Sequence, residues 1–410
     1  MNSEATIKKL HAVFETLTIV AFLALLWLPT LDHFFQLDHA RKPIENRAPA
    51  AWPQFAGIGQ SRDFVTGVES YFNDRFGFRN RLIRWNHHWK DHLFHDTSGK
   101  DVLIGRDRWL FYSGGEMLQH WTREASFSGQ DLENWRRLLE LRRDWLRERG
   151  SKYIFVVPPD KHTVYPEYLP GWMEKSPKPS KVQQLVEYMK AHSTVEVLDL
   201  SPTLLEAKKL RADYLKTDTH WNLFGGFMGY RALMQSLARQ MPGLEPLPLD
   251  AYNWKPLAKE PGDLTVMLGR TDGYTETQAL EPVAKKPLPT LEGLFDPVRL
   301  PQGEAKEFKS SYTLNDKASG KAIVFRDSFA GSWYPFLGQH FREVIYIWHY
   351  DWDRPLIERE KPDVVIDEML ERFFNNEDPI ALARKDQSSA TNTPPSLVTG
   401  KTAIPAGKSR

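Results

Sequence analysis

The chain has 410 residues, of which 41% are hydrophobic and 26% charged; this composition is typical of a folded globular protein and excludes a wholly disordered or fibrous chain. Lysine and arginine total 54 against 53 for aspartate and glutamate, so the net charge is +1 and no basic field indicates nucleic-acid binding. The chain contains no cysteine, which excludes disulfides, cysteine-based zinc sites, iron–sulfur clusters and thiol catalysis.

Residues 1–35 are predicted to form a transmembrane signal anchor. The run 16–31 is uncharged, and its helical length of about 24 Å approaches a hydrocarbon core of about 30 Å if the preceding apolar residues extend it and Glu15 snorkels. A cleaved signal peptide is the alternative, although no A-x-A-like cleavage site follows the run. Because Lys8 and Lys9 precede the run, we expect the anchor in the inner membrane and the body in the periplasm.

Residues 45–376 are predicted to form an α/β/α sandwich with a mainly parallel sheet. Apolar residues recur every three or four positions over 131–149 and 224–239, as in amphipathic helices. Short apolar runs predict buried strands at residues 153–157, 195–200, 322–325, 344–348 and 364–366. The alternation of helices and strands favours parallel pairing, and ligands in such folds bind beyond the carboxyl ends of the strands.

Two further segments have a different character. Between residues 251 and 319 the periodic pattern weakens and Pro, Gly and charged residues accumulate, which predicts a long excursion or a small irregular subdomain. Residues 385–410 are rich in Ser, Thr, Pro, Ala and Lys and are predicted to be a disordered tail.

Two short motifs carry catalytic chemistry. In the first, TDTHWN at 217–222, side chains two residues apart point the same way in a turn, so the Asp218 carboxylate can orient the His220 imidazole. The second, RDSF at 326–329, follows a predicted strand and presents the Ser328 hydroxyl at its carboxyl end, where the backbone N–H of the serine can serve an oxyanion hole. Together they supply a nucleophile, a base and an orienting acid.

Each of these patterns also has an ordinary structural interpretation. An Asp-x-His pair arises by chance in many proteins, and Asp-Ser-Phe is commonly a helix cap. His88, His92 and His95 lie near one helical face and resemble a metal site, but a solvated helix face is the favoured interpretation. Triad chemistry requires neither a metal nor a cofactor.

Beyond the two motifs, the sequence resembles the AlgJ/AlgX-type alginate O-acetyltransferases, or DHHW proteins, of the SGNH-hydrolase-like superfamily. The resemblance extends from about residue 45 to residue 375 and includes several segments that are specific when taken jointly. These segments are Glu45-Asn46-Arg47 with Pro53, residues 71–79, residues 102–105 with 109–112, residues 157–161, residues 165–167, and Gly262-Asp263-Leu264 with Met267-Leu268.

The resemblance implies acetyl transfer to hydroxyls of an exported polysaccharide, with Ser328 as nucleophile, His220 as base and Asp218 as orienting acid. Asp327, beside the serine, is an alternative acid. Acetyl-CoA is not available outside the cytoplasm, so a membrane partner of the MBOAT type is expected to deliver the acetyl group. An acetyl esterase with the same triad and a non-catalytic polysaccharide-binding component of an export complex remain alternative hypotheses.

Four other residues are candidates for contacts with the substrate or the oxyanion. The family often has Thr-Pro after its Asp-x-His-Trp motif, whereas this chain has Asn-Leu, and Asn222 is a candidate oxyanion donor. Arg326 is predicted to hold substrate or a neighbouring carboxylate. Trp221 and the aromatic cluster at 348–352, which includes Tyr350, are candidate platforms for sugar stacking.

Overall fold

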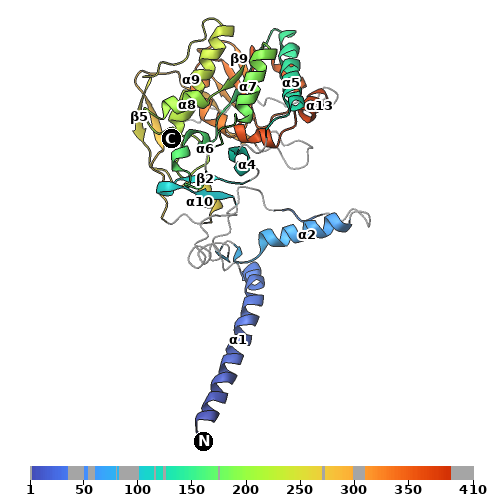
Figure 1. Ribbon diagram of the computed structural model, residues 1–410, viewed down its shortest axis with the longest axis vertical. Helices are drawn as coiled ribbons and strands as arrows, with labels where there is room; N and C mark the ends of the chain where they lie inside the picture. The colour runs from blue at the N-terminus through green and yellow to red at the C-terminus, as the bar shows by residue number, and fades with distance from the viewer. Residues whose placement is uncertain are drawn as a thin grey trace, which may run out of the picture.

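The computed structural model describes residues 2–35, 50–53, 61–79, 81–82, 101–114, 117–122, 126–173, 176–269, 273–298 and 310–388. The helices α1 (Asn2–Phe35) and α2 (Ser61–Arg75) lie outside a layered α/β body that contains the later elements (Figure 1). The predicted N-terminal helix is present as α1. However, no helix in the described part of the chain combines the length and the apolar character needed to cross a membrane, so the predicted transmembrane anchor is not supported.

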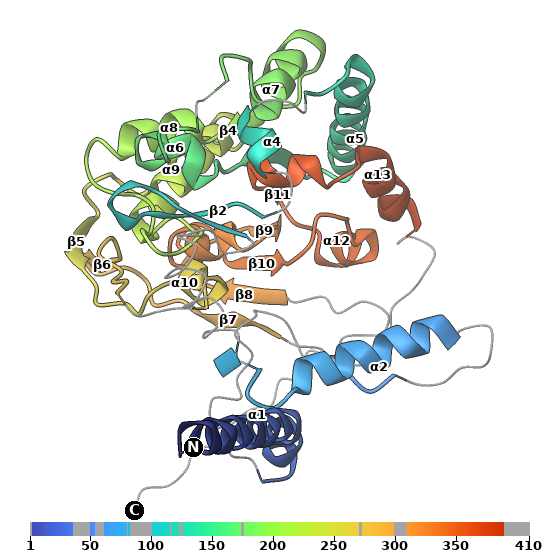
Figure 2. The same cartoon turned by 60° about the horizontal axis from the view of Figure 1, so that its bottom comes forward.

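A seven-stranded mixed sheet forms the centre of the body, with the strand order β4-β3-β11-β9-β10-β8-β7 (Figure 2). The five strands from β4 to β10 are parallel, and β8 and β7 continue the sheet in antiparallel fashion at one edge. The strands are β3 (Lys152–Val157), β4 (Val197–Asp199), β7 (Glu292–Val298), β8 (Ser310–Leu314), β9 (Lys321–Phe325), β10 (Glu343–Ile347) and β11 (Val364–Glu368).

All five predicted strands therefore exist, and they are the five parallel ones. The two antiparallel strands come from the segment 251–319, so part of that segment belongs to the main sheet. Its weak periodicity is consistent with strands at a sheet edge, which are less buried than central ones.

Helices cover both faces of the sheet, as predicted for an α/β/α sandwich. Alternate strand residues point to opposite faces, so Ile154 and Val156 enter one hydrophobic core while Phe155 and Val157 enter the other. The first core is covered by α6 (Lys161–Val164), α8 (Ser201–Ala207), α9 (Leu223–Gln240) and α11 (Tyr334–Leu337). The second is covered by α5 (Gly129–Arg147), α7 (Lys181–His192), α12 (Arg354–Glu360) and α13 (Pro379–Ser388).

Local sequence signals fix the ends of the long helices. Capping boxes begin α5, where Ser128 and Asp131 bond reciprocally, and α7, where Ser180 and Gln183 do the same. Gly150 follows α5 with a φ of 78°, a left-handed conformation that favours glycine and stops the helix.

Shorter elements lie outside the main sheet. They are the hairpin of β1 (Val102–Ile104) and β2 (Leu110–Tyr112), the hairpin of β5 (Tyr252–Pro256) and β6 (Leu280–Ala284), α4 (Met117–Thr122), α10 (Asp263–Met267), and the 3₁₀ helices η2 (Arg106–Arg108), η3 (Pro166–Tyr168), η4 (Phe329–Trp333) and η5 (Glu371–Asn375).

Of the tail that was predicted to be disordered, residues 385–388 belong instead to α13. Residues 389–410, the segment 45–47 and the histidines at 88, 92 and 95 lie outside the described residues.

Candidate active site

The structure brings Asp218, His220 and Ser328 into one hydrogen-bonded chain. His220 Nε2 lies 2.7 Å from Ser328 Oγ, and His220 Nδ1 lies 2.6 Å from Asp218 Oδ1. In the tautomer with a proton on Nδ1, the ring donates to Asp218 and accepts the serine hydroxyl at Nε2. The His220 side chain is 30% exposed and Ser328 is half-buried, so the reacting atoms are reachable from solvent. This is the geometry of a nucleophile, its base and an orienting acid.

The electrostatic environment keeps the Asp218 carboxylate ionised. Burial alone raises its pKa, but the hydrogen bond from His220 and the positive charges of His220 and Lys259 outweigh that effect and hold the pKa well below its usual range. Lys259 Nζ lies 3.5 Å from Asp218 Oδ2. The Asp218 carboxylate therefore carries its negative charge beside the His220 ring at neutral pH.

Ser328 lies at the start of η4, directly after β9, on a turn held by Asp327. One oxygen of Asp327 accepts the Phe329 N–H at 2.8 Å, and the other accepts the Leu370 N–H at 2.9 Å and the Tyr350 hydroxyl at 2.7 Å. Because both oxygens of Asp327 are used by the turn and its neighbours, the structure gives Asp218 and not Asp327 to the imidazole.

A second buried carboxylate supports the same turn. Glu368, at the end of β11, accepts the Asp327 N–H at 2.9 Å. Burial and the neighbouring Asp327 carboxylate raise the pKa of Glu368 well above its ordinary value. Among the described residues, no hydrogen bond from the Ser328 backbone N–H is found, which leaves that donor available at the predicted oxyanion position.

Arg326 braces the nucleophile turn from inside the protein. Its side chain is 2% exposed, one terminal nitrogen donates to the Asp327 carbonyl at 2.8 Å, and the other donates to the Tyr334 hydroxyl. The guanidinium also lies 4.6 Å from the ring centroid of Trp348. Arg326 was predicted to hold either substrate or a neighbouring carboxylate. Because its side chain is buried in the core, it does not lie where it could hold substrate.

The Asn222 side chain is the N-cap of α9 and not an oxyanion donor. Its carbonyl oxygen accepts the N–H groups of Phe224 at 2.9 Å and Gly225 at 3.0 Å. Its amide nitrogen donates to the carbonyls of Ala212 at 2.8 Å and Gln278 at 2.7 Å. Since both amide protons are used, the prediction that Asn222 stabilises an oxyanion is wrong.

Two of the predicted stacking aromatics are structural. Trp221 is 3% exposed and donates from Nε1 to the Phe329 carbonyl at 3.0 Å. It therefore packs the loop that carries Asp218 and His220, here called the base loop, against η4. It offers no surface to a sugar. Tyr350 is committed to Asp327 through its hydroxyl, and its ring lies 5.7 Å from that of Phe373. Within the predicted aromatic cluster, Trp348 keeps an exposed ring, with 39% of its surface accessible.

Two carboxylates without a predicted role hold the loop that carries Asp218 and His220. Asp263 accepts both the N–H and the hydroxyl of Thr219, at 2.7 and 2.6 Å. Glu276 accepts the N–H and the hydroxyl of Thr217, at 2.9 and 2.6 Å, and the Lys216 N–H at 3.1 Å. Asp263 lies in a segment that resembles the family, and this resemblance could have marked it as a functional residue. No such resemblance was found around Glu276.

Lys161 ties the base loop to the β1–β2 hairpin. Its buried Nζ donates to the Leu110 carbonyl at 2.6 Å and to the Lys216 carbonyl at 3.3 Å. Burial lowers the pKa of Lys161 to about 7, although the carboxylates of Asp218, Asp263 and Glu276 oppose that change. Lys161 belongs to a segment that resembles the family, but that resemblance does not reveal its buried position.

Asp218, His220 and Asp263 form a group of possible metal ligands, with one donor atom from each lying within 4.8 Å of the others. In the observed hydrogen-bonding pattern His220 has no free lone pair, because Nδ1 donates to Asp218 and Nε2 accepts from Ser328. A metal at this position would therefore have to displace the triad contacts.

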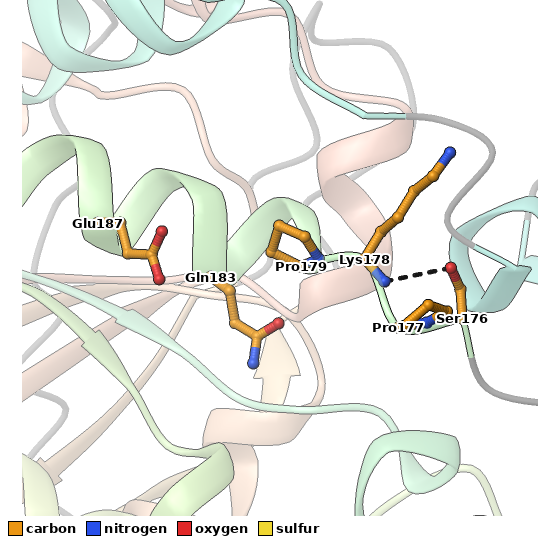
Figure 3. Close-up of a pocket in the computed structure, with 6 residues that line it drawn as sticks. All are labelled: Ser176, Pro177, Lys178, Pro179, Gln183 and Glu187. Carbon is orange, nitrogen blue, oxygen red and sulfur yellow. Dashed lines mark hydrogen bonds between the residues drawn. The ribbon is translucent and has the colours of Figure 1, made fainter.

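Among the hollows of the described part of the body, one of about 140 Å³ is lined by Tyr112, Gly114, Met117, Arg372, Phe373, Asn375 and Asn376. The Phe373 ring lies 5.7 Å from that of Tyr350, whose hydroxyl donates to Asp327. Another hollow lies at the start of α7, where Lys178 N–H donates to Ser176 Oγ at 3.4 Å (Figure 3). Gln183, which lines this second hollow, is already engaged in the α7 capping box. Neither Asp218, His220 nor Ser328 lines either of these hollows.

Comparison with known proteins agrees with the sequence resemblance. A family model described as "SGNH hydrolase-like domain, acetyltransferase AlgX" matches residues 102–303. The "Probable alginate O-acetylase AlgJ" of Pseudomonas aeruginosa is 34% identical over 134 residues, 32% of this chain and 32% of that protein. The protein of the same description from Pseudomonas syringae is 26% identical over 229 residues, 55% of this chain and 51% of that protein. The matches therefore span about a third to a half of these relatives.

Two solved structures are also similar. The "O-Acetyltransferase Domain of Pseudomonas putida AlgJ" has a TM-score of 0.43 and 21% identity, covering 70% of this chain and 99% of that one. Bacillus cereus PatB1 has a TM-score of 0.48 and 17% identity, covering 66% of this chain and 96% of that one. The family-model match and the curated relatives support the resemblance of this chain to the AlgJ/AlgX-type family, and the matching model is described as an SGNH hydrolase-like domain.

Proposed function

We propose that this protein is an O-acetyltransferase that transfers acetyl groups to hydroxyls of an exported polysaccharide, with Ser328 as nucleophile, His220 as base and Asp218 as orienting acid. The observation that carries the proposal is the hydrogen-bonded chain from Asp218 through His220 to a half-exposed Ser328. The descriptions of the relatives as probable alginate O-acetylases support acetyl transfer and favour an alginate-like acceptor.

In the first half-reaction, His220 Nε2 takes the proton of the Ser328 hydroxyl as Oγ attacks the carbonyl carbon of an acetyl donor. The bond between the acetyl carbon and the donor atom then breaks, and the departing group takes the proton from His220. In this proposal the Ser328 N–H stabilises the negative charge on the carbonyl oxygen. The product is an acetyl ester of Ser328.

In the second half-reaction, a sugar hydroxyl replaces the departed donor. His220 takes its proton, the sugar oxygen attacks the acetyl-serine, and the Ser328 oxygen leaves with the proton from His220. Because this sequence needs an acetyl donor at the site, we propose that a membrane acyl-transfer partner of the MBOAT type supplies it outside the cytoplasm.

A chromogenic acetyl ester tests the function directly. The wild-type protein should release the chromophore, transfer the acetyl group to an added alginate oligosaccharide and lose both activities in Ser328→Ala. Ser332→Ala is the matched control, because Ser332 lies on the same 3₁₀ helix and its hydroxyl donates to the Phe329 carbonyl, away from the imidazole.

Two results would replace the proposal with its alternatives. Ester cleavage that yields only acetate, with no product on any of the oligosaccharides supplied, would indicate an acetyl esterase. Full polysaccharide acetylation in cells that carry Ser328→Ala would indicate a non-catalytic role for this chain.

A further inference from the structure

A second carboxylate lies beside the imidazole of His220. Asp263 Oδ2 is 3.8 Å from His220 Nδ1, on the side of the ring that also faces Asp218. The Thr219 hydroxyl lies between them, donating to Asp263 Oδ2 at 2.6 Å and lying 3.1 Å from His220 Nδ1. Because that hydroxyl donates its one proton to Asp263, its oxygen faces the ring nitrogen as an acceptor.

The position of Asp263 is fixed by its packing on the base loop. Thr219 binds both oxygens of the carboxylate, through its N–H and its hydroxyl. Gly262, the preceding residue, lies so close to Asp218 that an added Cβ would come within 2.3 Å of the Asp218 Cβ. The Gly262 N–H also donates to the Thr217 hydroxyl at 2.9 Å. Asp263 therefore cannot move independently of the loop that carries the base.

The charged groups around the imidazole define what Asp263 adds. Asp218 contacts the ring directly, and Lys259 lies 3.5 Å from Asp218 on its far oxygen. Burial and the charge of Asp218 raise the pKa of Asp263, while His220 and Thr219 lower it. Buried Lys161 interacts electrostatically with both aspartates. Two carboxylates thus share one imidazole, one through a direct hydrogen bond and one through a threonine hydroxyl.

We propose that Asp263 is a second acidic positioning residue of the triad, which orients the His220 ring through Thr219 and stabilises the imidazolium that forms when His220 takes the serine proton. This inference rests on the proposed function. Asp263 does not touch the reacting atoms, so its contribution is smaller than that of Asp218. It also supports the activity that remains when Asp218 is replaced.

The test compares Asp263→Asn, Asp218→Asn and the double variant in the cleavage of a chromogenic acetyl ester from pH 5 to 9. Asp263→Asn should lower kcat/KM by about tenfold, because a charge-assisted contact is lost. Its acid limb should move to lower pH, because removal of a negative charge near the imidazole makes protonation of His220 less favourable. The double variant should be about tenfold slower than Asp218→Asn alone.

Thr219 gives an independent variant that keeps both carboxylates. Thr219→Val removes the bridging hydroxyl and should reproduce the loss of rate of Asp263→Asn, whereas Thr219→Ser should retain wild-type activity. Asp316→Asn, which changes an exposed aspartate, controls for a general change in charge and should leave the profile unchanged.

The possible outcomes separate this inference from the proposed function. If Asp263→Asn and Thr219→Val both keep the wild-type rate and acid limb, the positioning role of Asp263 is excluded while the triad stands. If Asp263→Asn loses activity without a shift of the acid limb, Asp263 acts only on the fold of the loop and the inference is also overturned. A wild-type protein that cleaves no ester overturns the proposed function itself.

Discussion

The two halves of the proposed triad are held in different ways. Ser328 lies at the end of a central strand, on a turn whose supports Asp327 and Glu368 are buried side chains at the ends of neighbouring parallel strands. Asp218 and His220 lie on a loop outside the sheet, which is fixed by the carboxylates of Asp263 and Glu276. The proposed nucleophile is therefore positioned by the core, whereas the proposed base is positioned by a few polar contacts from a segment that follows it in the chain.

This comparison predicts different consequences for changes on the two sides. Changes to the nucleophile turn should affect folding and activity together, because the same groups serve both. Changes to the supports of the base loop should lower activity more than stability, because the loop lies outside the main sheet.

The largest effect is expected at the acid itself. Asp218→Asn removes the charge that favours the imidazolium and disturbs the tautomer of His220, and should lower kcat for ester cleavage by about 10⁴-fold. Steady-state kinetics measure this loss, and thermal unfolding should show that the variant remains folded. A loss of less than about tenfold would contradict the assignment of Asp218 as the principal acid.

The next effect concerns the stability of the nucleophile turn. Asp327→Ala leaves the Phe329 N–H, the Leu370 N–H and the Tyr350 hydroxyl without their buried acceptor. Each buried unsatisfied group costs about 1–3 kcal/mol, so the loss of the acceptor for three groups should lower the free energy of unfolding by at least about 3 kcal/mol. Denaturant titration measures the change, with Asp316→Ala as the exposed control; equal stability of the two variants would show that the turn does not depend on Asp327.

A smaller loss of stability is expected on the base side. Glu276→Gln places an NH₂ group against donors of Lys216 and Thr217, and should lower the free energy of unfolding by about 1–2 kcal/mol. Ester cleavage should nevertheless fall at least tenfold, because the Asp218 and His220 loop shifts. Glu281→Gln, an exposed change on β6, is the matched control. Unchanged activity in Glu276→Gln would mean that the loop holds its geometry without this support.

A pH dependence of stability, which changes no residue of the proposed triad, is expected from Lys161. Its pKa is lowered to about 7 in the folded protein, so above pH 7 the unfolded state, with its ordinary lysine pKa of about 10.4, binds more protons than the folded state. Stability therefore rises with pH in this window, by at most about 1.4 kcal/mol per pH unit. The free energy of unfolding of wild type minus that of Lys161→Met should increase from pH 7 to 9. A difference that stays constant or decreases would show that Lys161 is charged in the folded protein throughout this range.

The sequence predicted those parts of the fold and site that depend on local pattern. Buried parallel strands are short segments rich in apolar residues, so β3, β4, β9, β10 and β11 were recognisable. The Asp-x-His spacing and the serine after β9 are also local, and the structure brings these residues together as expected.

The remaining features depend on tertiary contacts that no local pattern encodes. Asn222 has the chemistry of an oxyanion donor, but its amide protons are used by carbonyls at positions 212 and 278. Trp221 and Arg326 adjoin the triad residues in sequence, but they are buried. Asp263 and Glu276 act on the base loop from more than forty residues away, so their role became visible only with the fold.

The most direct test of the account is to locate the covalent intermediate. Wild-type protein treated with an activated acetyl donor and quenched in acid should carry one acetyl group, and peptide mapping by mass spectrometry should place it on Ser328. His220→Ala, treated for the same time, should carry little or none. An acetyl group on another residue, or equal labelling of the two proteins, would contradict the assignment of Ser328 as the nucleophile and His220 as its base.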